Sequence, residues 1–244
     1  MTAAGSASPR QLALALGHRE SFDRADFLLG PGNETALSLI DRWPDWPSQA
    51  IILTGPEGAG KSHLAAMWAH AVGGRIISSR AIDAAAVPRA LSTGALVIED
   101  AGCGGLDEAA LFHLLNLAKE ERAYVLITAR CAPAGWAPLI ALCDLASRLR
   151  AMPVATLAPP DDVMLGALLV KLFADRQLAV DAALIAYLVK RIERSFAAAR
   201  AAIALLDHAA LRLKRPVNRA LASEILRTPA WWNEETDQER DQAS

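Results

Sequence analysis

Cysteine and excess charge are both scarce in this sequence, and each scarcity excludes a class of function. The three cysteines, Cys103, Cys131 and Cys143, are scattered with no Cys-x-x-Cys spacing. That pattern offers no common zinc site and no disulfide framework, so it indicates a reducing compartment. The formal net charge of −2 over 244 residues gives no overall attraction to nucleic acid.

Long apolar runs are also missing, although 53% of the residues are hydrophobic. No run approaches the roughly 20 residues that a membrane-spanning helix needs, and the first residues lack the apolar segment of a signal peptide. We therefore expect a cytoplasmic protein that does not bind membranes. The length and the apolar content suit one large α/β domain with a small satellite.

What the sequence does contain is a phosphate-binding loop. Residues Gly55–Ser62 read Gly-Pro-Glu-Gly-Ala-Gly-Lys-Ser and fit the pattern G-x-x-x-x-G-K-[ST] without mismatch. An apolar run at 50–54 predicts a buried strand before the loop, and residues 64–72 predict a helix after it, which is the context that this motif requires. The loop therefore predicts binding of ATP or ADP with Mg²⁺.

The predicted ligands follow from this motif. Lys61 can reach the β- and γ-phosphates, and the Ser62 hydroxyl can hold Mg²⁺. The nucleotide-binding residues predicted from the loop are Gly55, Pro56, Glu57, Gly58, Ala59, Gly60, Lys61, Ser62 and His63. Upstream, Phe27, Leu28 and Gly30 are candidates for contacts with the adenine, but simple core packing explains them as easily.

Acidic residues follow another predicted strand, at 95–98. In P-loop ATPases, an acid at this place positions Mg²⁺ through water and a neighbouring acid orients the attacking water, which are the roles predicted for Glu99 and Asp100. The alternative is a strand that simply ends in two solvated acids. The usual order is Asp before Asp or Glu, so the order Glu-Asp leaves hydrolysis by this chain in doubt.

The remaining pattern alternates strands with helices and then becomes all helical. Strands are predicted at 50–54, 75–78, 95–98, 124–128 and 154–157, and helices at 34–42, 64–72, 83–91 (broken or kinked at Pro88), 107–122 and 139–149. This alternation indicates an α/β, three-layer parallel sheet. After Pro159-Pro160, helices are predicted at 161–176, 181–191, 195–214 and 218–226, which form a small all-α lid. The expected division is a flexible segment 1–20, an α/β domain 21–158, a lid 161–227 and a polar tail 228–244.

Several segments resemble the AAA+ replication initiator family of DnaA, and most closely its Hda members, over roughly residues 22–226. They are Phe27–Asn33 before the loop, Val125–Arg130, Asp144–Leu149 (Asp-Leu-Ala-Ser-Arg-Leu) and Arg191–Ala197 in the lid. The resemblance implies that Thr128 is the sensor-1 residue, that Arg148 is an arginine finger acting in trans, and that Arg194 is the sensor-2 arginine. The alternatives without a catalytic role are that Thr128 is an ordinary strand residue, that Arg148 forms a structural ion pair, and that Arg194 lies on a solvated helix face.

The N-terminal hexamer 11–16 resembles the Q-x-x-L-x-L peptide by which replication proteins hold the bacterial sliding clamp, the β subunit of DNA polymerase III. Gln11, Leu12, Leu14 and Leu16 would make the contacts. The alternative is a strand or helix packed on the core. In DnaA, a helix-turn-helix domain follows the lid. No basic recognition helix follows it here, so we expect no sequence-specific DNA binding.

Together these resemblances imply a negative regulator of chromosomal replication initiation with weak or absent ATPase activity of its own. It would bind the clamp and stimulate ATP hydrolysis by DnaA through Arg148. The alternatives are a self-sufficient P-loop ATPase similar to DnaA or a helicase loader, and an adaptor that catalyses nothing. Self-association is left open.

Overall fold

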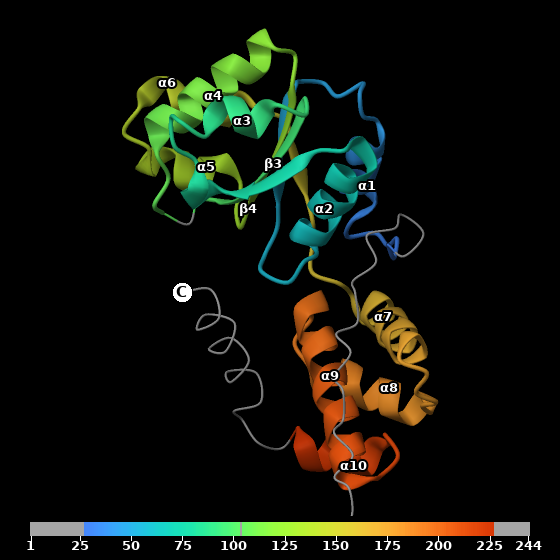
Figure 1. The fold of residues 1–244 in the computed structure, drawn as a ribbon. Helices are drawn as coiled ribbons and strands as arrows, with labels where there is room; N and C mark the ends of the chain where they lie inside the picture. Colours follow the sequence, from blue (N-terminus) through green and yellow to red (C-terminus); the bar gives the residue numbers. More distant parts are fainter. Residues whose placement is uncertain (1–26, 103, 227–244) are drawn as a thin grey trace, which may run out of the picture.

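The computed structural model describes residues 27–102 and 104–226, and its centre is a five-stranded parallel sheet (Figure 1). The strands lie in the order β2-β3-β4-β1-β5 and all neighbours are parallel. Their bounds are β1 Ala50–Thr54, β2 Arg75–Ser78, β3 Ala95–Ala101, β4 Tyr124–Ala129 and β5 Val154–Thr156. The α/β fold class predicted from the sequence is confirmed.

Helices cover both faces of the sheet. They are α1 Glu34–Asp41, α2 Lys61–Val72, α3 Val87–Leu91, α4 Glu108–Glu120, α5 Pro133–Trp136 and α6 Cys143–Ala151, with short 3₁₀ turns η2 Ser79–Ala81 and η3 Ala137–Leu139. Alternate residues of a strand point to opposite faces. Accordingly, Ile52 packs in the core with α3, α4 and α6, whereas its neighbours Ile51 and Leu53 pack with α1 and α2. Burial on both faces explains the unbroken apolar runs.

The C-terminal helices form a separate core below the sheet in Figure 1. They are α7 Asp162–Asp175, α8 Ala182–Val189, α9 Phe196–Leu213 and α10 Arg219–Ile225, and we call this group the lid. Each of them begins at a side-chain cap, for example the Asp161 carboxylate, which accepts a hydrogen bond from the Met164 N–H at 2.7 Å. Such caps satisfy backbone donors that the helix itself leaves unpaired.

No helix in the described ranges, 27–102 and 104–226, combines the length and the apolar character needed to cross a bilayer.

Several boundaries differ from the sequence expectation. Helix α3 begins at Val87 rather than at residue 83, because the Asp83 carboxylate accepts a hydrogen bond from the Ala86 N–H at 2.7 Å and closes a turn first. Pro88 therefore lies in the first turn of the helix, where its missing N–H costs nothing. The α5–η3 segment was not predicted. It is fixed by Trp136, which is buried and donates its indole N–H to the Cys131 carbonyl at 3.2 Å.

Candidate nucleotide-binding site

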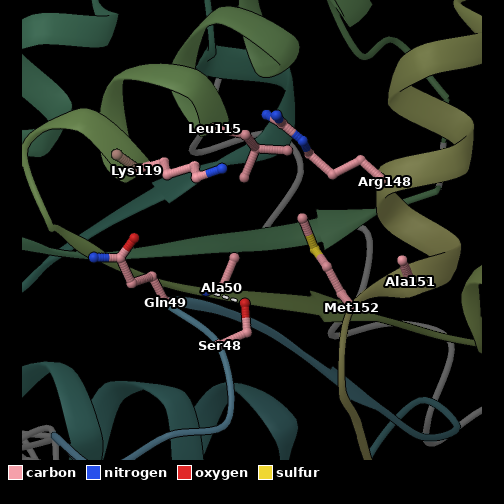
Figure 2. A pocket seen from close by; sticks show the side chains of 9 residues that line it. Ser48, Gln49, Ala50, Leu115, Lys119, Arg148, Ala151 and Met152 are labelled. Carbon is pink, nitrogen blue, oxygen red and sulfur yellow. Dashed lines mark hydrogen bonds between the residues drawn. The ribbon is translucent and has the colours of Figure 1, made fainter.

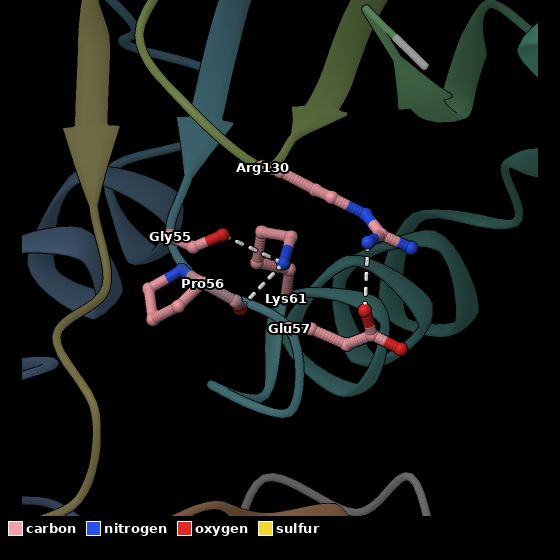
Figure 3. Close-up of polar contacts among 5 residues, drawn as sticks. All are labelled: Gly55, Pro56, Glu57, Lys61 and Arg130. Carbon is pink, nitrogen blue, oxygen red and sulfur yellow. Dashed lines mark hydrogen bonds and ion pairs between the residues drawn. The ribbon is translucent and has the colours of Figure 1, made fainter.

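The phosphate-binding loop connects the carboxyl end of β1 to the first turn of α2. Gly58 and Gly60 have φ angles of +71° and +92°, the left-handed region that favours glycine. The Lys61 side chain folds over the loop, where its Nζ donates hydrogen bonds to the carbonyl oxygens of Gly55 and Pro56, each at 2.8 Å (Figure 3). The buried ammonium group is thus held in the concave side of the loop, where a phosphate needs a cation.

The start of α2 also fits a polyphosphate. Helix α2 begins at Lys61, three residues earlier than predicted, and its cap residue Gly60 has no side chain to satisfy the first N–H groups. Those donors and the helix dipole attract anions. The exposed Ser62 stands in the first turn, where its hydroxyl could serve a magnesium ion. The residues present therefore fit a nucleotide with Mg²⁺.

Beside the loop, the two predicted acids lie in β3, which continues through them by way of an irregularity between Ile98 and Ala101. Asp100 has a φ of +57° at this point. Its N–H donates to the Thr128 Oγ1 at 3.1 Å, and its carbonyl accepts from the Ser79 hydroxyl at 3.0 Å. Thr128 itself is buried, with 1% of its surface exposed. Its hydroxyl thus holds the backbone at Asp100, whose carboxylate is exposed to solvent.

Arg130, a cation that the sequence analysis did not predict, also lies at this carboxyl end of the strands. Arg130 directly follows β4, and its Nη1 lies 2.7 Å from the Oε2 of Glu57 in the loop (Figure 3). The backbones are joined as well, because the Gly55 N–H donates to the Ala129 carbonyl at 3.3 Å. No local pattern predicts this pair, because its two members are 73 residues apart in the chain.

The segment that precedes the loop contacts both the α/β domain and the lid. The Phe27 ring stacks on the His63 ring of α2 with centroids 5.9 Å apart. Leu28 packs against the lid core, and a Cβ at Gly30 would collide with the Met164 side chain of α7. The predicted adenine candidates therefore lie beside α2 and between the two cores, while their role in binding stays a prediction.

The lid rests directly on the phosphate-binding loop. The Phe196 N–H donates to the Gly58 carbonyl at 2.8 Å, and a Cβ at Gly58 would lie 2.6 Å from that of Ser195. The predicted sensor Arg194 directly precedes these residues, but its guanidinium pairs with Asp162 of α7 at 2.9 Å. Ser195 and Phe196 are the loop contacts that sequence reasoning missed.

Arg148 lies far from this loop, in a pocket of about 270 Å³ beside the amino end of β1 (Figure 2). The lining residues are Ser48, Gln49, Ala50, Leu115, Ala118, Lys119, Arg148, Ala151 and Met152. The Arg148 Nη1 donates to the Asn116 Oδ1 at 2.7 Å, and its guanidinium lies 5.2 Å from the Phe112 ring centroid. Within residues 27–102 and 104–226, no carboxylate pairs with it.

The predicted clamp-binding residues Gln11, Leu12, Leu14 and Leu16 lie outside the described residues.

Comparison with known proteins places the fold. No protein-family model and no curated protein matches the sequence. Among solved structures, domain III of the Thermotoga maritima replication initiation protein DnaA is similar, with a TM-score of 0.70, 18% identity, and 84% of this chain and 95% of that chain covered.

Two further structures extend this likeness. AMPPCP-bound DnaA from Aquifex aeolicus has a TM-score of 0.61 and 18% identity, with 76% of this chain and 65% of that chain covered. The Thermotoga maritima RuvB Holliday junction branch migration motor has a TM-score of 0.66 and 16% identity, with 85% and 72% covered. At these identities the comparisons show the fold alone, a five-stranded parallel α/β domain followed by helices that this chain shares with the DnaA and RuvB structures.

Proposed function

We propose that this chain is a nucleotide-bound negative regulator of chromosomal replication initiation. It binds the DNA-loaded sliding clamp through Gln11–Leu16 and stimulates ATP hydrolysis by DnaA through Arg148 in trans. The fold likeness to DnaA and the motif resemblances from Phe27 to Ala197 support this proposal. The nucleotide, ADP or ATP, would be held with Mg²⁺ by Lys61 and Ser62.

The observation that carries the proposal is the position of Arg148. Ala50, the first residue of β1, lines its pocket. The phosphate-binding loop begins at the opposite end of the same strand, after Thr54, the last residue of β1. At about 3.3 Å per residue, β1 separates these two ends by roughly 15 Å. An arginine at the amino-terminal end of the strands is poorly placed for the nucleotide bound by this chain. It is available to the nucleotide of another module that packs against that end of the sheet.

The surroundings of Arg148 suit such a role. Its guanidinium is oriented by a neutral amide and an aromatic ring, and no carboxylate of the described chain cancels its charge. A phosphate oxygen can replace the Asn116 amide as hydrogen-bond acceptor without leaving an acid unpaired. Where arginine fingers have been measured in GTPases, they are worth about 10³–10⁵ in rate.

The direct test is DnaA-ATP hydrolysis with clamp-loaded DNA and the full chain. Arg148→Ala is expected to abolish the stimulation of DnaA. Arg150→Ala is the matched control, because this exposed arginine lies on the same helix two residues away and should leave the stimulation intact. Equal stimulation by wild type and Arg148→Ala would refute the role of the finger and leave a non-catalytic adaptor.

The clamp contact has its own test. Calorimetry with purified sliding clamp should detect micromolar or tighter binding. A Gln11→Ala/Leu14→Ala double variant should lose it, while His18→Ala, outside the hexamer, should retain it. Absence of binding by the wild-type chain would overturn the clamp part of the proposal.

The second candidate is a self-sufficient P-loop ATPase. A complete phosphate-binding loop beside Glu99 and Asp100 favours it, as does the likeness to a branch migration motor. Under this alternative, the purified chain turns over ATP without any partner, and Lys61→Ala abolishes the turnover.

A further inference from the structure

The lid carries a positive charge that the chain as a whole does not have. Residues 161–226 contain ten Lys and Arg against seven Asp and Glu, a formal charge of +3, whereas the full chain has −2. A local excess of one sign in a chain of opposite net charge is typical of a surface that binds a charged partner. The excess on the lid therefore favours an anionic partner.

The acids of the lid do not neutralise its exposed cations. Six of the seven carboxylates form ion pairs with other residues of the lid or cap its helices, namely Asp161, Asp162, Asp175, Asp181, Asp207 and Glu224. Within residues 27–102 and 104–226, no carboxylate forms an ion pair with five exposed cations of the lid, namely Lys190, Arg191, Arg212, Lys214 and Arg219. We call these five residues the basic cluster.

One aromatic ring holds two members of the cluster together. The guanidinium carbons of Arg191 and Arg219 lie 5.2 Å and 5.6 Å from the centroid of the Tyr187 ring. Arg191 follows α8, whereas Arg219 is the first residue of α10, which packs on α8 and which Figure 1 shows at the end of the lid farthest from the sheet. The two guanidiniums are therefore at most about 11 Å apart, and their mutual repulsion is relieved when an anion binds between them.

The other three cations lie close to this pair. Lys190 directly precedes Arg191 in the chain. Arg212 and Lys214 are at the end of α9, against which α10 also packs. The chain from Lys214 to Arg219 spans at most about 18 Å between Cα atoms. The basic cluster is thus one surface, formed where the ends of α8 and α9 meet the start of α10.

We propose that the basic cluster binds the phosphate backbone of duplex DNA without reading its sequence. Along each DNA strand a phosphate follows about every 3.4 Å of helix axis, so two guanidiniums at most about 11 Å apart can contact phosphates of the same strand. Arginine suits this partner because its planar fork of N–H groups matches pairs of phosphate oxygens. This inference goes beyond the proposed function and does not depend on it.

The Tyr187 ring explains why the binding would be independent of sequence. An aromatic ring on a nucleic-acid surface can stack on bases, which requires a free face. Arg191 and Arg219 both lie over this half-buried ring, so it serves to orient the two arginines rather than to stack. Contacts then go to phosphates, which fix the position of a protein on DNA but carry no sequence information.

The test is fluorescence anisotropy of the full chain with a labelled DNA duplex of arbitrary sequence, at several salt concentrations. The wild-type chain should bind with a dissociation constant in the micromolar range at low salt, as non-specific DNA binding does. Arg191→Ala/Arg219→Ala should weaken this binding about tenfold or more. It should also reduce the slope of log K against log salt by about two, because each phosphate contact contributes about −0.9. Arg191→Lys/Arg219→Lys should keep the slope, because both charges remain.

Arg42→Ala/Arg150→Ala is the matched control, because it removes two positive charges from exposed positions of the α/β domain. Its affinity should stay within twofold of wild type, with the same salt slope. Equal binding by the wild type and Arg191→Ala/Arg219→Ala would overturn the inference. So would a wild-type chain that does not bind DNA, whether or not it binds vesicles of anionic lipid. Neither the clamp nor DnaA enters this assay, so both of these results would leave the proposed function standing.

Discussion

The contact between lid and loop can be tested by adding one methyl group at Gly58. In Gly58→Ala, the new Cβ would lie 2.6 Å from the Ser195 Cβ, at a residue whose carbonyl accepts the Phe196 N–H and whose φ is +71°. The left-handed backbone alone costs an alanine about 1–2 kcal/mol. The clash adds about 1–3 kcal/mol, and the weakened hydrogen bond about 1 kcal/mol.

Gly94→Ala isolates the backbone term from this sum. Gly94 has nearly the same φ, +74°, but its Cβ would meet nothing within 4 Å. In urea titrations, Gly94→Ala should lower the free energy of unfolding by about 1–2 kcal/mol and Gly58→Ala by about 3–6 kcal/mol. Only Gly58→Ala should weaken ADP binding. Equal losses of stability, with ADP binding retained in both variants, would show that the lid does not rest on the loop.

Three further variants probe separate parts of the fold. Thr128→Val keeps the shape of the side chain but removes the acceptor for the Asp100 N–H, so urea titration should show a loss of about 1 kcal/mol. Trp46→Ala removes a buried ring that stacks on Trp68 and should lower the free energy of unfolding by about 3–5 kcal/mol. Trp43→Ala, at a ring that is 36% exposed, should lower it clearly less, and comparable losses would contradict the packing. Asp181→Ala removes the cap of α8 and should cost about 1 kcal/mol in the same assay, and no loss would mean that the cap is dispensable.

The fold was predictable where local sequence and burial agree. The central strands β1, β3 and β4 are apolar runs that the helices on both faces bury, and the phosphate-binding loop is a contiguous motif. Boundaries were less predictable where side chains compete with the helix, as Asp83 does before α3. The α5–η3 segment was not predicted, because Pro133, Gly135 and Pro138 indicate turns in the sequence. The burial of Trp136 decides the conformation of this segment.

The site was only partly predictable, because its parts meet across long stretches of chain. The motif predicts the loop itself, but the Glu57–Arg130 pair and the Gly58–Phe196 hydrogen bond join residues with no relation in local sequence. The resemblance predicted Thr128 as the sensor-1 residue, and the structure adds the hydrogen bond from the Asp100 N–H that no pattern indicates. The resemblance marks Arg194 as a sensor, yet its ion pair with Asp162 follows from the packing of α7 against α9.

The hydrogen bond between Phe196 and Gly58 also has a mechanical consequence. Phe196 is the first residue of α9, whose 18 residues make it a rod of about 27 Å. The loop holds this rod at one end, so a rotation of about 10° there would displace the far end by about 5 Å. The helix thus acts as a lever that pivots at Gly58 of the phosphate-binding loop, so a small movement of the loop becomes a larger movement at the far end of the lid.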